Sequence, residues 1–104
     1  MSTQENTKEP ELQVMVWYNE EDWENCRSLF DDAQLLPKNY NEWHKRAKAM
    51  VSEVEASGDL VVKVTIDTVL FPAWCKEKGR KMDAESRTTF AIEAVQRQQF
   101  LNNM

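Results

Sequence analysis

Residues 60–66 have the sequence LVVKVTI, which is the clearest sign of a strand in the chain. It alternates between a wholly apolar face and a face that carries Lys63 and Thr65. Such alternation, with many β-branched residues, predicts a strand with one face in the core and the other partly wet. Residues 12–18, LQVMVWY, alternate in the same way and predict a second strand.

The two predicted strands need partners for their backbone groups. A two-stranded sheet is marginal alone but becomes viable when helices pack on it. We therefore expect residues 12–18 to pair with 60–66, within one chain or across the two-fold axis of a dimer. Both arrangements remain open and can hold together. The exposed edge of so small a sheet is also suited to binding a partner chain.

Two helices are predicted between the strands. Asn19 begins the first, which ends before Pro37 because proline disfavours helical geometry in the preceding residue. The second runs from Asn39, which forms a capping-box-like pair with Glu42, to Gly58 as its C′ residue. The apolar face of the first helix is spaced by three and four residues: Trp23, Cys26, Phe30 and Ala33.

Two further helices follow the second strand. Asp67 or Thr68 caps the third, Pro72 predicts an irregular start, and Gly79 ends it. Asp83 caps the last helix. The order strand, two helices, strand, two helices predicts an α+β fold with about four helices packed on a small two-stranded sheet.

Composition indicates one soluble globular domain. The 104 residues include 18 acidic and 13 basic residues, and 41% are hydrophobic. Residues 1–11 are polar and predict a disordered leader, so that 12–104 form the single domain. No apolar run approaches the roughly 20 residues of a membrane span. With no signal peptide and only two cysteines, we expect reduced thiols, a cytoplasmic location and no membrane association.

Charge is distributed unevenly along the chain. Residues 1–32 hold nine acidic and two basic residues, whereas 33–104 hold nine acidic and eleven basic residues. The acidic first third argues against nucleic acid and favours basic partners. A basic cluster near Gly79 nevertheless offers an alternative site for an anion or nucleic acid. Its members are Lys76, Lys78, Arg80, Lys81 and Arg87.

Residues for catalysis or metal binding are few. A thiol enzyme needs a thiolate beside a base, and His44 is the one imidazole available. Cys26 and Cys75 both lie among apolar residues, so a small thiol-dependent enzyme is only an alternative. These three scattered residues do not supply the four ligands of a zinc site. Gly58 and Gly79 are isolated and form no phosphate-binding loop. We expect no cofactor and no metal.

The favoured prediction is a non-enzymatic module that binds a protein partner or a second copy of itself. Four tryptophans in so short a chain indicate an aromatic core. Tyr and Trp are also enriched at interfaces, so we place Met15, Trp17 and Tyr18 at the interaction surface.

One stretch resembles a known type of sequence. Residues 61–91 contain VKVTID and FPAWCK, followed by Gly79, Asp83, Ser86-Arg87 and Phe90-Ala91. With the preceding helix that carries Trp43, this resembles a family of short uncharacterised bacterial proteins, a domain of unknown function, over most of the chain. The resemblance implies a bacterial cytoplasmic origin and a free-standing small domain. It transfers no catalytic residue.

Overall fold

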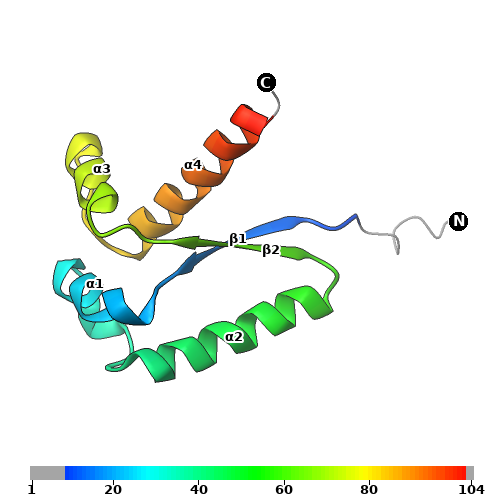
Figure 1. The fold of residues 1–104 in the computed structure, drawn as a ribbon, viewed down its shortest axis with the longest axis horizontal. Coiled ribbons are helices and arrows are strands. Elements are labelled where there is room, and N and C mark those ends of the chain that lie inside the picture. The colour runs from blue at the N-terminus through cyan, green and yellow to red at the C-terminus, as the bar shows by residue number, and fades with distance from the viewer. Residues whose placement is uncertain (1–8, 103–104) are drawn as a thin grey trace, which may run out of the picture.

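The computed structural model of the protein describes residues 9–102 and has the predicted α+β architecture (Figure 1). Short 3₁₀ helices at Glu20–Asp22 and Ala33–Leu35 flank the first α-helix. Most of the predicted leader lies outside the described residues. The main elements are β1 (Leu12–Trp17), α1 (Trp23–Leu29), α2 (Tyr40–Ala56), β2 (Leu60–Thr65), α3 (Leu70–Lys78) and α4 (Ala84–Asn102).

β1 and β2 pair with each other in parallel within one chain. Leu12 lies opposite Leu60, and Trp17 lies opposite Thr65. Parallel neighbours require a long crossover connection, and α1 and α2 provide it. The intrachain arrangement of the two predicted strands is therefore confirmed.

Asp59 fixes the beginning of the sheet. Its side chain is buried and accepts hydrogen bonds from the backbone nitrogen of Glu11 (3.0 Å) and the side-chain Nε2 of Gln13 (3.1 Å). The carbonyl of Glu11 also accepts a bond from the backbone nitrogen of Leu60 (2.9 Å). Glu11, assigned above to the leader, is thus bound to the sheet.

Helices cover both faces of the sheet. In Figure 1, α2 runs along one side of the strands, and α3 and α4 lie on the other. The ring of Trp17 contacts that of Trp43 on α2, with centroids 5.1 Å apart, so the face that carries Trp17 is turned toward α2. The alternate face, with Val14 and Val16, is turned toward α4. The C-terminal end of α4 rises away from the strands (Figure 1).

The core lies at the C-terminal ends of the two strands. Its buried members are Tyr18, Trp23, Cys26, Phe30, Ile66, Phe71, Trp74 and Cys75. The opposite end of the sheet is less covered, because Leu12 and Leu60 are 41% and 61% exposed. The radius of gyration is 16.1 Å, against about 13 Å for a compact chain of this length. The packed core thus lies at one end of the sheet, and the strands are more exposed where they begin.

The predicted helix ends are largely confirmed. The side chain of Asn39 accepts from the backbone nitrogen of Glu42 (2.8 Å), although the Glu42 carboxylate bonds forward to Arg46 and does not complete a capping box. Gly58 and Gly79 both have positive φ after their helices, as C-terminal glycines do.

The first helix is shorter than predicted. α1 ends at Leu29, four residues before Ala33, because the chain turns away at Asp31 and Asp32 to bond with a distant loop. Pro72 is the third residue of α3, in the first turn, where its missing N–H costs no helical hydrogen bond.

Candidate interaction surface

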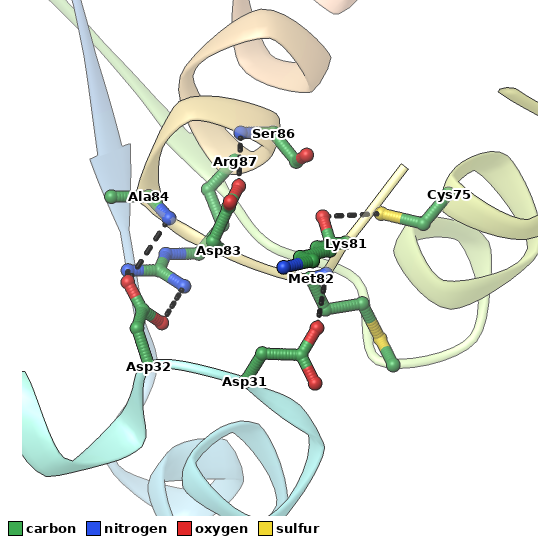
Figure 2. A network of polar contacts seen from close by, with 9 residues as sticks. All are labelled: Asp31, Asp32, Cys75, Lys81, Met82, Asp83, Ala84, Ser86 and Arg87. Atoms are coloured by element: carbon green, nitrogen blue, oxygen red, sulfur yellow. Dashed lines mark hydrogen bonds and ion pairs between the residues drawn. The ribbon is translucent and has the colours of Figure 1, made fainter. Parts of the chain in front are cut away.

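Asp31 and Asp32 join the loop after α1 to the beginning of α4 (Figure 2). The backbone of Asp31 donates to the carbonyl of Met82 (2.9 Å), and its carboxylate accepts from the Met82 nitrogen (2.8 Å). The Asp32 carboxylate accepts from the nitrogen of Ala84 at 3.0 Å. Asp83 caps α4, as predicted, by accepting from the nitrogen of Ser86 at 3.0 Å.

Arg87 lies at the centre of this network. Its two terminal nitrogens donate to the two carboxylate oxygens of Asp32 at 2.8 and 3.1 Å. The side chains are only 5% and 14% exposed, and the guanidinium lies 4.2 Å from the ring centre of Phe30. The hydrogen bonds from Arg87 hold the pKa of Asp32 below its usual value. Arg87 therefore has a structural role, because its buried guanidinium pairs with Asp32 and packs on the ring of Phe30 in the core.

The predicted basic cluster does not form one exposed surface. Arg87 is buried, and Arg80 donates to Ser86 (3.2 Å) and Thr89 (3.4 Å) while its guanidinium lies 5.5 Å from the ring centre of Trp74. The members that stay exposed are Lys76, Lys78 and Lys81. Helical spacing would have identified Arg87, since it lies one turn before buried Ala91 on the same face.

The predicted interface residues lie in different environments. Tyr18 is only 3% exposed and contacts the rings of Trp23, Phe30 and Trp43, so its placement at the surface was wrong. Strict alternation would have put Tyr18 on the inner face with Val14 and Val16.

Trp17 and Met15 are half-buried on the side of the sheet that faces α2. The ammonium of Lys63 lies 4.4 Å from the ring centre of Trp17, and the ring also meets Trp43 and His44. Trp17 is therefore partly covered by Lys63, Trp43 and His44, and its place at an interface stays a prediction.

Burial keeps both thiols protonated. It raises the pKa of Cys26 to about 11, with nearby Asp22 adding to the shift, and it raises the pKa of Cys75 as well. His44 packs against Tyr40 on α2, on the opposite side of the sheet from the α3 helix that holds Cys75. A reactive thiol needs a lowered pKa, so this arrangement argues against thiol catalysis.

The two outer edges of the sheet are open. Among residues 9–102 the sheet contains only β1 and β2. The backbone nitrogen of Leu60 donates to the carbonyl of Glu11, and that of Ile66 donates to the carbonyl of Trp17. In a parallel pair this register means that the odd-numbered residues of β1 form the backbone hydrogen bonds to β2. The N–H and C=O groups of residues 12, 14 and 16 therefore point away from β2. On β2 the corresponding outward residues are 61, 63 and 65.

Large exposed apolar side chains occur at several places on the molecule, among them Leu35 (76%), Val69 (73%) and Leu70 (61%). Leu12 and Leu60 begin the paired strands, on the face turned toward α4, and are 41% and 61% exposed. Phe100 and Leu101, near the end of α4, are 64% and 56% exposed.

Comparisons with protein-family models, curated proteins and solved structures return no match for the chain. This agrees with a resemblance that carries no assigned activity, and the bacterial origin stays a prediction. Across residues 9–102, no group of three His, Cys, Asp or Glu residues is placed to hold a metal ion. None of the helices in that range is long and apolar enough to cross a membrane.

Proposed function

We propose that this chain is a non-enzymatic, self-associating module that forms a two-fold symmetric dimer through the outer edge of β1. The observation that supports the proposal is the unpaired edge of β1, which carries no charge from Leu12 to Trp17. Unpaired strand edges pair with other chains unless charge, proline or a covering element protects them.

The edge of β1 is better suited to pairing than that of β2. The centre of the outward-facing β2 residues is Lys63, whose side chain is exposed. A symmetric β2–β2 pair centred there would place two lysines directly opposite each other, which is destabilising. In β1 the central outward residue is Val14, so a symmetric pair would place valine opposite valine.

Two-fold symmetry makes the β1 pair antiparallel and self-complementary. With Val14 at the axis, Leu12 of one copy lies opposite Val16 of the other, and their outward N–H and C=O groups bond directly. Exposed Leu12 then gains an apolar neighbour. The result is a four-stranded sheet, which is more stable than the two-stranded sheet of one chain.

The test is the absolute mass in solution, measured by light scattering after size-exclusion chromatography over a dilution series. We expect twice the 12.2 kDa of the chain for the wild type. Val14→Pro removes an outward N–H and leaves the bonds to β2 intact, so it should give a monomer. Val61→Pro makes the same change on the outer edge of β2 and should leave the dimer unchanged.

Circular dichroism of each variant separates loss of the dimer from loss of the fold. If Val14→Pro does not fold, Leu12→Lys provides a second test, because Leu12 is already exposed and a charge there protects the edge. A wild type that is monomeric at every concentration would overturn the proposal. So would a folded Val14→Pro variant that stays dimeric, or equal dissociation by Val61→Pro.

A further inference from the structure

An open pocket of about 680 Å³ lies between the end of α1 and the beginning of α2. Three cationic side chains line it, Arg27, Lys38 and Arg46, against one carboxylate, that of Glu42. Glu42 is engaged by Arg46 at 2.7 Å, which leaves an excess of positive charge. The chain carries a formal net charge of −5, so this local excess runs against the overall balance.

One side-chain nitrogen of Arg27 lacks a hydrogen-bond partner within the described part of the chain. Among residues 9–102, its Nε is the one buried side-chain nitrogen or oxygen without a hydrogen-bond partner. A buried donor that is left unpaired destabilises the protein, and more so when it is charged. A bound acceptor in the pocket would remove that destabilisation.

The remaining wall of the pocket combines the polar side chains of Gln34 and Asn39 with an apolar segment that is fixed in place. Leu35, Leu36 and Pro37 line it, and Leu35 is 76% exposed. The carbonyl of Lys38 accepts a hydrogen bond from the indole nitrogen of buried Trp23 at 3.4 Å. The segment between the helices is therefore anchored to the core, where Leu36 packs, while Leu35 faces solvent.

We infer that this pocket binds a small organic anion, whose carboxylate or phosphate group pairs with Arg27 and Lys38 and whose apolar body covers Leu35 and Pro37. Arginine binds both anionic groups through its planar array of donors. The site is separate from the β1 edge, so it stands whether or not the chain dimerises.

The test is an NMR titration that follows the indole N–H signals of the tryptophans. Trp23 reports on the pocket through its bond to Lys38, whereas Trp74, which bonds to Glu93 and lines a second pocket with Arg97, reports any binding at that other place. The probes are hexanoate, hexyl phosphate, inorganic phosphate and uncharged hexanol. We expect saturable shifts of the Trp23 signal with hexanoate or hexyl phosphate, weaker binding of inorganic phosphate and no saturation with hexanol. Comparing the first two identifies the preferred anionic group.

Matched variants assign the binding to the pocket. Arg27→Gln should weaken binding about tenfold or more, as expected for loss of a hydrogen bond to a charged group. Lys45→Gln removes the same charge beside Arg46 but outside the pocket and should leave affinity unchanged. If Arg27→Gln does not fold, exposed Lys38→Gln serves in its place. No saturable shift with either organic anion, or equal weakening by Lys45→Gln, would overturn the inference.

Discussion

Arg87 on α4 and Asp32 in the loop after α1 form a bidentate ion pair across 55 positions of sequence. The pair lies over the ring of Phe30 and is largely removed from solvent. It connects the two layers of the molecule at the end where the core is densest. At the opposite end of the sheet Asp59 is buried and binds Glu11 and Gln13, whereas Leu12 and Leu60 are exposed.

Removing one partner of this pair should destabilise the fold strongly. Asp32→Ala leaves the buried guanidinium of Arg87 without its counter-charge, and we expect the free energy of unfolding to fall by about 3 kcal/mol or more. Urea denaturation measures the change. Arg46→Ala, which breaks an exposed pair on α2, is the control and should cost less than about 0.5 kcal/mol beyond the intrinsic helix preference. Similar losses in the two variants would contradict a structural role for Arg87.

The same pair predicts a dependence of stability on acid pH. Arg87 lowers the pKa of Asp32 in the folded protein, whereas the pKa of an Asp carboxyl in the unfolded chain is about 3.9. Its contribution is therefore complete above the unfolded pKa and is lost as pH falls through the lower folded pKa. The wild type should lose more stability than Asp32→Asn over this range. The pKa values of Asp67 and Asp83 are also lowered, but both residues remain in the variant, so the difference isolates Asp32. Parallel curves would count against the prediction.

The sequence patterns predicted the strands and helices of this fold better than they predicted which charged and aromatic side chains are exposed. Alternation identified both strands, and the Asn39 cap and the glycines at 58 and 79 marked helix ends, because these signals are local. Arg87 was assigned to an exposed cluster because its partner, Asp32, is brought to it only by the tertiary fold. The sequence predicts that a sheet of two strands has exposed edges. It does not show which backbone groups point outward, because that depends on the parallel register, and only the register places Lys63 at the centre of the β2 edge.

Gly79 offers a test of local backbone conformation. It has φ +65° after α3, a left-handed conformation that disfavours residues with a Cβ. No atom lies within 4 Å of an added Cβ, so the cost of Gly79→Ala should come from the backbone alone, about 1 kcal/mol. Gly79→Asn should cost less, since Asn tolerates this conformation. Thermal unfolding compares the variants, and equal stability of Gly79→Ala and wild type would show that the left-handed turn is not required.

The thiols provide a test that separates the proposed module from a thiol enzyme. Because the pKa of Cys26 is raised to about 11, its thiolate fraction at pH 8 should be about a hundredfold below that of an unperturbed thiol. Iodoacetamide should therefore modify Cys26 and Cys75 slowly in the native protein and rapidly in urea, as followed by mass spectrometry. Rapid alkylation of either thiol in the folded protein would revive the catalytic alternative.

Burial of Cys26 also predicts a loss of stability at alkaline pH. A raised pKa in the folded state means that the unfolded thiol ionises first, so the contribution is complete below about pH 9 and is lost as pH rises to about 11. Cys26→Ala should flatten the fall in unfolding free energy over that interval, although removal of the buried side chain lowers stability at every pH. The pKa of Tyr18, raised from 10.0 to about 12, adds a loss that begins at about pH 10 and overlaps this interval, but Tyr18 is present in both proteins, so the difference between them isolates Cys26. If wild type and Cys26→Ala lose stability in parallel between pH 9 and 11, the Cys26 thiol does not titrate as its burial requires.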